Sequence, residues 1–257
     1  MSLAESLAVL LGGAALVNLV VGVLVLDAER FRGVGSRLRE SAPYLAFLGG
    51  ILVVNKVARD FGPELSWILG WNVTGFIYGL EGGFVAQVQS VATPWLTTFL
   101  SAVYLVGYVS LLTFPFVAYL THPDRKVLET TAVAYGLNYA IGLVCYTLFI
   151  SYGPRNLIPD MVDPLLYGTY PQAQLVTSRV NVNTNVFPSL HTSLSVTVAL
   201  LAWRTRDTFP RWTVVAVPLA GCVVVSTMYL GIHWATDVVA GVLLAVVSVW
   251  LARRLVS

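Results

Sequence analysis

The sequence predicts an all-α integral membrane protein, a bundle of six or seven transmembrane helices. Its composition indicates this class, because 57% of the 257 residues are hydrophobic and only 11% are charged. Soluble domains carry about 25% charged residues, so this chain lacks the polar surface that water requires. The composition excludes an ordinary cytosolic enzyme and a disordered chain, and a net charge of +2 excludes a nucleic-acid-binding protein.

Seven apolar runs are long enough, or nearly so, to cross a bilayer as helices, which takes about 20 residues each. The second and fifth are short, so that six spans remain an alternative. Together the runs predict a single transmembrane domain over residues 1–257. They lie near Leu3–Leu26, Ala42–Val57, Pro94–Leu120, Val127–Ile150, Leu190–Trp203, Trp212–Ile232 and Trp234–Leu251.

A further apolar segment, Phe61–Thr93, is interrupted by glycines and is rich in aromatic residues such as Trp67 and Trp71. Aromatic side chains concentrate at the membrane–water interface. We therefore expect this segment to be interfacial or re-entrant rather than spanning.

The basic residues predict the orientation. With the N-terminus outside and the C-terminus in the cytoplasm, 11 of the 15 Lys and Arg residues fall in cytoplasmic loops, as the positive-inside rule requires. The other four, Lys56, Arg59, Arg155 and Arg179, fall on the outer side. The eleven are Arg30, Arg32, Arg37, Arg39, Arg125, Lys126, Arg204, Arg206, Arg211, Arg253 and Arg254.

The fifth span begins at the outer side with Pro188-Ser189-Leu190-His191. A proline suits the start of a helix, and the free N–H groups there attract an anion. Ser189 adds a hydroxyl donor to this position. The alternative is an ordinary helix start with a histidine at the interface.

His233 and Asp237 begin the last span and are four residues apart, which places them on one face of a helix. A carboxylate within the membrane requires a partner. If Asp237 accepts a hydrogen bond from one imidazole nitrogen, the other nitrogen is free to act as a nucleophile. The alternative is a structural pair that locks two helices together.

Arg155, in Gly153-Pro154-Arg155-Asn156, follows the fourth span on the outer side. Its planar guanidinium suits a phosphate, although an arginine anchored at the interface is the alternative. Because all three segments end on one side of the membrane, two histidines, a carboxylate, a serine and an arginine converge there. Phosphoryl transfer to a histidine requires these groups.

The two ordered motifs, Pro188-Ser189-Leu190-His191 and Ser226…His233…Asp237, resemble those of the type 2 phosphatidic acid phosphatase superfamily over about residues 127–251. The resemblance implies the helical core that this family shares with vanadium haloperoxidases. It also implies a lipid phosphatase or phospho-headgroup transferase that acts through a phosphohistidine.

By motif, the resemblance makes His233 the nucleophile, Asp237 the residue that orients it and His191 the general acid. Ser189, Arg155 and Ser226 would contact the phosphate. The substrate would be a phospholipid or polyprenyl phosphate at the outer membrane face. We expect no cofactor and no metal, because no Cys/His spacing indicates a metal site.

One family residue differs, because the arginine that usually follows the motif serine is Thr227 here. Together with Gly153-Pro154-Arg155, this makes the chain similar to the inositol phosphorylceramide synthase (aureobasidin-resistance) branch, whose members transfer a phospho-headgroup between lipids. Lys56 or Arg59, at the outer end of the second span, would replace the missing cation. The alternative is that both side chains extend to lipid headgroups.

Two other functions are alternatives to this one. A transporter would use the His–Asp pair as a proton relay and would show charged or broken helices at mid-membrane and repeated halves. An intramembrane serine protease would need a Gly-x-Ser-x-Gly-like motif. The sequence shows none of these features.

Overall fold

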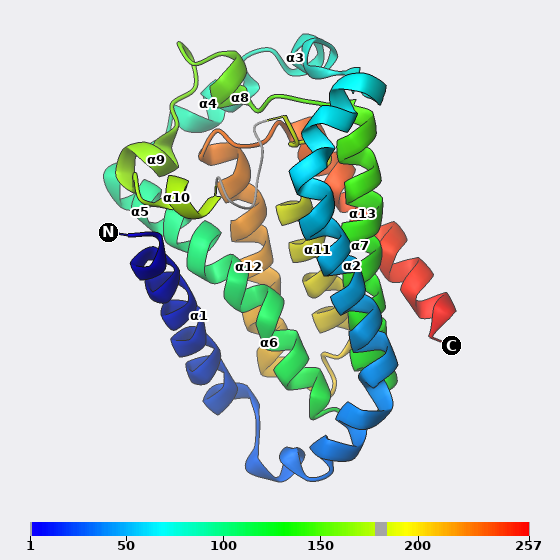
Figure 1. Ribbon diagram of the computed structural model, residues 1–257. Helices are drawn as coiled ribbons and strands as arrows, with labels where there is room; N and C mark the ends of the chain where they lie inside the picture. The colour runs from blue at the N-terminus through cyan, green and yellow to red at the C-terminus, as the bar shows by residue number, and fades with distance from the viewer. Residues whose placement is uncertain (1, 178–183, 257) are drawn as a thin grey trace.

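The computed structural model is an all-α bundle whose main helices run alternately between two ends (Figure 1). It describes the backbone of residues 2–177 and 184–256 and, within these ranges, all side chains except those of residues 59–63 and 176. The upper end, as drawn in Figure 1, carries the short helices α3, α4 and α8. The lower end carries the connection between α1 and α2.

Six helices of the described chain are long and apolar enough to cross a membrane, which confirms a multi-pass bundle. They are α1 (Leu3–Val25), α2 (Val34–Leu69, apolar over Val34–Ala58), the continuous α5 (Pro94–Ala102), η2 (Val103–Gly107) and α6 (Tyr108–Leu120), then α7 (Lys126–Leu148), α12 (Pro210–Tyr229) and α13 (Ala235–Leu255).

The seventh helix, α11 (Leu190–Arg204), has 15 residues and lies inside the bundle against α7, α12 and α13. Its length is about 22 Å at 1.5 Å per residue, which is less than the roughly 30 Å of a bilayer core. Because protein surrounds α11, it does not have to match the bilayer by itself. The short fifth run of the sequence is therefore the central helix of the fold.

Hydrogen bonds inside the bundle hold α11 in place. The Asn138 amide of α7 donates to the Thr197 hydroxyl at 3.1 Å and accepts from the Ser193 hydroxyl. All three side chains are fully buried. Small and hydroxyl-bearing residues are typical of contacts between membrane helices, because they allow close approach and bond across the interface.

The second span is longer than the sequence predicts, because α2 continues to Leu69 and includes the first residues of Phe61–Thr93. The rest of that segment crosses the upper end as short elements rather than spanning the bundle (Figure 1). These elements are β1 (Trp71–Asn72), α3 (Thr74–Glu81) and α4 (Phe84–Gln89). Strand β1 pairs in parallel with β2 (Phe149–Ile150), which follows α7.

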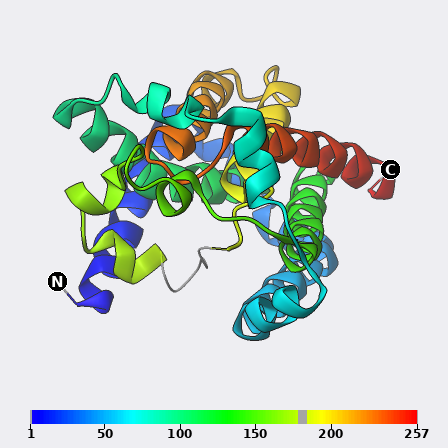
Figure 2. The same cartoon turned by 90° about the horizontal axis from the view of Figure 1, so that it is seen from above.

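The long connection between α7 and α11 also lies at the upper end. It contains α8 (Pro154–Leu157), α9 (Leu165–Thr169) and α10 (Ala173–Thr177). Of these elements, α10 contacts α1, whereas the upper part of α2 lies apart from α1, as seen from above in Figure 2. The two N-terminal helices therefore meet at the lower end, through η1 (Ala28–Phe31), and diverge upwards.

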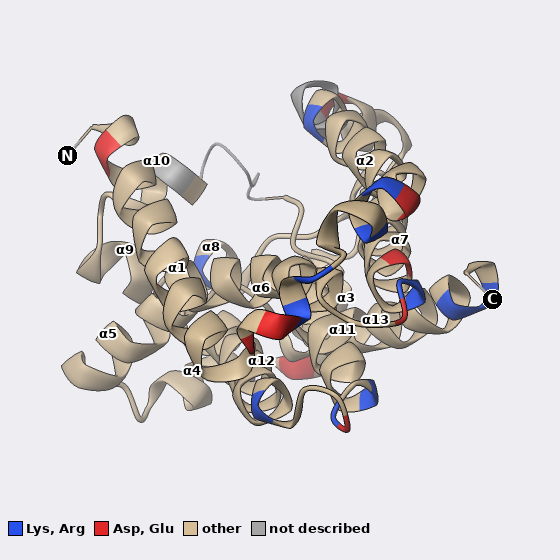
Figure 3. Ribbon diagram, turned by 90° about the horizontal axis from the view of Figure 1, so that it is seen from below, with Lys and Arg blue, Asp and Glu red and all other residues tan. Residues whose placement is uncertain are grey.

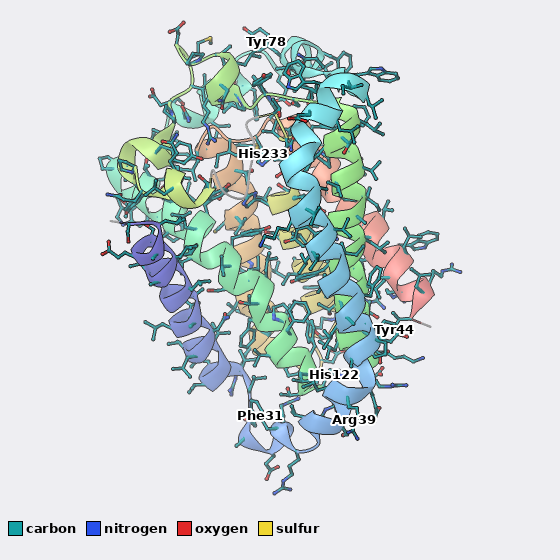
Figure 4. All side chains as sticks on the ribbon, viewed as in Figure 1. Phe31, Arg39, Tyr44, Tyr78, His122 and His233 are labelled. Atoms are coloured by element: carbon teal, nitrogen blue, oxygen red, sulfur yellow. The ribbon has the colours of Figure 1, made fainter. Side chains whose placement is uncertain are left out.

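The lower end is rich in basic residues that tie its loops together. Arg30 donates to the Thr208 carbonyl at 3.2 Å, and Arg211 donates to the Leu24 carbonyl at 3.0 Å. Seen from below, Lys and Arg mark helix ends and loops, whereas most helix middles carry neither charge (Figure 3). Arg39 and His122 lie at this end and His233 lies at the other (Figure 4).

Candidate active site

The turn between α12 and α13 presents His233 at the upper end of the bundle. Gly231 adopts a left-handed conformation with φ +71°, and a Cβ there would lie 2.8 Å from Val162, so only glycine fits. The N–H groups of Ile232 and His233 donate to the Thr227 carbonyl at 3.0 and 3.1 Å. These bonds close the end of α12 and hold the backbone of His233.

His233 and Asp237 form a buried pair, with 1% and 0% of their surfaces exposed. The imidazole Nδ1 lies 3.4 Å from Asp237 Oδ2 and is the donor of this hydrogen bond in the tautomer that carries the proton on Nδ1, and the same oxygen accepts from the Trp234 N–H at 2.9 Å. With the proton on Nδ1, the lone pair lies on Nε2. Among the residues that the structure describes, Nε2 is buried and meets no partner in hydrogen-bond geometry, although the Val186 backbone also interacts with the ring. A lone pair on this nitrogen is the arrangement of an oriented nucleophile.

The charge state of His233 suits the same role. Burial lowers the pKa of the imidazole to about 3, and the positive charge of Arg155 contributes in the same direction. The ring is therefore neutral at physiological pH, and its lone pair is available for attack on phosphorus.

Arg155 provides the cation of the site. The backbone N–H of Arg155 donates to the Gly231 carbonyl at 3.2 Å, and this bond connects α8 to the turn that carries His233. Gly153 permits this close approach, because a Cβ there would lie 2.4 Å from the Ile232 carbonyl oxygen. The guanidinium packs 4.6 Å above the Tyr167 ring and donates to its hydroxyl at 3.3 Å through Nη2.

The other terminal nitrogen of Arg155, Nη1, is buried and has no hydrogen-bond partner within the described part of the chain. A buried cationic N–H group that is left unused is costly unless an anion binds it. The site therefore combines an unpartnered cationic donor with an unpartnered imidazole nitrogen. Such a set fits a phosphate, which offers oxygens to the donor and phosphorus to the nucleophile.

His191 lies in the first turn of α11, and its ring centre is 6.1 Å from that of His233. Ser189 caps this helix, since its hydroxyl accepts from the Thr192 N–H at 3.3 Å. The Ser189 N–H donates to the Asp237 carbonyl at 3.0 Å. A backbone hydrogen bond thus joins the two motifs, which are far apart in the sequence, close to His191 and His233.

Two tyrosines pack against His191, and the sequence analysis did not identify them. The ring centres of Tyr104 and Tyr108 lie 4.6 and 4.5 Å from that of His191. Tyr104 belongs to η2, a single π-helical turn, and such turns often occur at functional sites. No sequence pattern marks this turn, because it forms only where the third span packs on its neighbours.

Glu81 is a second residue that the sequence analysis missed. Its carboxylate accepts from the N–H groups of Ala235, at 2.9 Å, and Thr236. It therefore caps the first turn of α13, which directly follows His233 and carries Asp237. A carboxylate in an apolar interfacial segment, one of two there with Glu64, was the available sign, because such a group needs donors.

Two of the remaining predicted residues, Ser226 and Lys56, have described side chains. Ser226 is buried in α12, and its hydroxyl donates to the Val223 carbonyl of the same helix at 2.6 Å. Lys56 is exposed on α2, next to a residue that lines the cavity described below. The Arg59 side chain and Arg179 lie outside the described part of the chain. Roles for these residues in phosphate binding stay predictions.

Comparison with known proteins identifies the family. Residues 79–251 match the model of the PAP2 superfamily. No curated protein and no solved structure matches the chain. The matched range begins in α3, so the interfacial elements and the third span belong to the shared core, which extends beyond the 127–251 predicted from the motifs. Helices α1 and α2 lie outside it.

Proposed function

Because the chain belongs to the PAP2 superfamily, we propose that this membrane protein cleaves a lipid phosphate by transferring the phosphoryl group to His233. The observation that carries the proposal is the pair of unpartnered buried nitrogens, His233 Nε2 and Arg155 Nη1. One supplies a neutral nucleophile and the other a cationic donor. Both belong to segments that the Gly231 turn holds together.

In the first step, Nε2 of His233 attacks the phosphorus and the bond from phosphorus to the lipid oxygen breaks. Arg155, together with Ser189, stabilises the charge on the phosphoryl oxygens. His191 donates a proton to the departing lipid oxygen, which leaves as an alcohol. Asp237 accepts from Nδ1 throughout and balances the charge that develops on the imidazole.

In the second step, an acceptor attacks the phosphohistidine and gives its proton to His191, which restores the starting state. With water as acceptor, the product is inorganic phosphate. With a lipid alcohol, the product is a new phospholipid, as the similarity to the inositol phosphorylceramide synthase branch implies. Thr227, in place of the usual arginine, bonds its hydroxyl to the Val224 carbonyl, so that Arg155 is the cation of the described site.

We place the reaction at the outer membrane face. The site lies at the end of the bundle opposite the arginine-rich loops (Figure 4), and positive loops face the cytoplasm. This orientation puts the N-terminus outside and the C-terminus inside. The clustering of the polar groups at one end also favours an enzyme over a transporter, whose relay would continue along the membrane normal.

The experiment that tests the proposal uses purified protein in detergent with phosphatidate and a polyprenyl phosphate. Released phosphate and new lipid products are followed together, with and without a lipid alcohol and with a metal chelator. We expect turnover that the chelator does not abolish. Acid-labile radioactive label on the protein, absent from His233→Ala, would identify the phosphohistidine. Undiminished turnover by His233→Ala would refute the mechanism.

Arg155→Lys and Arg155→Ala test the phosphate site separately. We expect Arg155→Ala to lower kcat/KM by about 10²- to 10³-fold, the effect of removing one strong donor to a developing anion. Arg155→Lys restores the charge without the planar fork and should recover part of this loss. Wild-type kcat/KM in both variants would exclude Arg155 as the phosphate ligand.

A further inference from the structure

A cavity of about 420 Å³ extends from the site into the bundle. Both N-terminal helices line it where they diverge. Leu7 and Leu10 of α1 lie on one side of the cavity, and Asn55 and Ala58 of α2 lie on the other. These four residues precede the matched range 79–251. Its volume lies within the range of small-molecule sites, about 300 to 1,000 Å³.

Much of the cavity lining is apolar or aromatic, with six leucines, a valine and four tyrosines beside polar residues such as Asn55 and Thr113. None of the described lining residues is Asp, Glu, Lys or Arg. The Asn55 amide is already used, because it donates to the Ile51 carbonyl at 3.1 Å and the Tyr139 carbonyl at 3.4 Å. The lower cavity therefore offers no partner for a charged headgroup and suits a hydrocarbon chain.

The depth of the cavity corresponds to one leaflet. On α7 its lining runs from Tyr139 to Thr147, which is eight residue steps or about 12 Å along the helix. On the third span it runs from Tyr104 to Thr113, or about 14 Å. Half of a hydrocarbon core of about 30 Å is about 15 Å. A chain in this cavity would lie parallel to the chains of the surrounding leaflet.

The upper end of the cavity lies at the candidate active site. His191 and His233 both line it, and so do the two tyrosines that pack against His191. The polar and apolar parts of a lipid phosphate therefore have separate places, the phosphate at the histidines and the chain below. Leu7, on the α1 wall, is 37% exposed, so this wall borders the lipid-facing surface.

We propose that this cavity binds the apolar chain of the phosphate-bearing substrate, and that α1 and α2, outside the family core, determine which chains are accepted. The proposal rests on the proposed function for the identity of the phosphate end. The substrate class is then an amphiphile with a terminal phosphate and an extended hydrocarbon chain. A water-soluble phosphate monoester would use only the upper part of the site.

Leu10→Trp tests this assignment, with Leu11→Trp as the matched control. Leu11 is 57% exposed on the same helix and does not line the cavity. A long-chain phosphatidate and its short-chain, water-soluble analogue are compared. We expect Leu10→Trp to lower kcat/KM for the long chain by about ten- to a hundredfold, since each excluded methylene loses its burial. The short-chain substrate should change less than about threefold.

Equal losses for both chain lengths would overturn the proposal, and so would an equal effect of Leu11→Trp. Leu143→Phe, on the opposite wall, provides a smaller intrusion in case Leu10→Trp does not fold. Leu143→Phe should show the same discrimination by chain length. If no folded variant of the cavity discriminates between the two chain lengths, the proposal is refuted.

A binding measurement distinguishes failure of the cavity site from failure of the proposed function. A long-chain alkyl phosphate should raise the melting temperature of the wild-type protein in detergent, and Leu10→Trp should reduce this shift. Turnover without chain-length discrimination refutes the chain site alone. A chain-dependent shift without turnover of any lipid phosphate supports the chain site and refutes the proposed reaction.

Discussion

The two N-terminal helices and the helices of the family core are packed in different ways. Within an apolar stretch of 18 residues in each span, 11% of α1 and 17% of α2 are buried inside the protein, compared with 39–44% for α5–α6, α7, α12 and α13. A Cβ added at Gly49 of α2 would have no neighbour within 4 Å. At Gly241 of α13 it would lie 2.6 Å from the Ser189 carbonyl oxygen.

From this difference we infer that the tightly packed core fixes the geometry of the site, whereas α1 and α2 influence which substrate chains are accepted. The core holds the proposed catalytic side chains through short backbone hydrogen bonds and close packing, as the proposed reaction at phosphorus requires. Helices α1 and α2 leave most of their surface exposed, although α2 packs along α7, and together they form one wall of the cavity. Changes in the core should therefore affect every substrate, whereas changes in α1 or α2 should affect substrates by their chains.

The largest expected effect comes from the core histidine. His233→Ala should lower kcat at least about 10³-fold for long- and short-chain substrates alike, because removing a nucleophile eliminates its chemistry. His122→Ala, at the opposite end of the bundle, is the control and should retain wild-type kcat. The measurement is phosphate release in detergent. A loss of kcat restricted to long-chain substrates would contradict the division of roles between the family core and helices α1 and α2.

A pair of glycine substitutions compares the packing directly. Gly241→Ala forces the Ser189 carbonyl away and should lower the free energy of unfolding by about 1–3 kcal/mol. Gly49→Ala meets no neighbour and should raise it by up to about 1 kcal/mol, because alanine is the better helix former. Denaturation in detergent measures both. Equal effects of the two substitutions would mean that core and periphery are packed alike.

The stability of the core should also depend on pH through His233. Its folded-state pKa of about 3 lies below the unfolded value of about 6.5. Between these values the unfolded state binds more protons, so stability falls as the pH decreases through this window. The loss should reach about 2 kcal/mol between pH 7 and pH 5.

Melting temperatures of the wild type and of His233→Gln, measured across this range of pH, check the contribution. The wild type should melt progressively lower at acidic pH, and the variant should lack this part of the dependence. Identical pH profiles would show that His233 is not the buried neutral group described here.

The smallest effect compares two helix caps. Glu81 caps α13 in the core, and Glu5 caps α1 through the Ser2 N–H at 2.8 Å. Glu81→Gln should destabilise the protein by about 1 kcal/mol and lower kcat more than it changes KM, since α13 positions Asp237. Glu5→Gln should leave kcat unchanged. Steady-state kinetics of both variants test whether Glu81 is a positioning residue.

Much of the protein could be predicted from its sequence, because membrane helices and catalytic motifs are local patterns. Apolar runs identified the multi-pass bundle, and the four-residue spacing of His233 and Asp237 predicted a pair that the structure shows in contact. The motifs also identified the PAP2 superfamily, which the family match confirms. Each of these inferences depends on a period or spacing within a single segment.

The tertiary structure decided what depends on contacts between distant segments. Only packing shows that the short α11 is central, that α2 extends to Leu69, and that Glu81 caps α13 from more than 150 positions away in the chain. The same holds for the tyrosines beside His191 and for the cavity that α1 and α2 enclose. A sequence specifies each helix through its own period, whereas the space between helices exists only once they have packed.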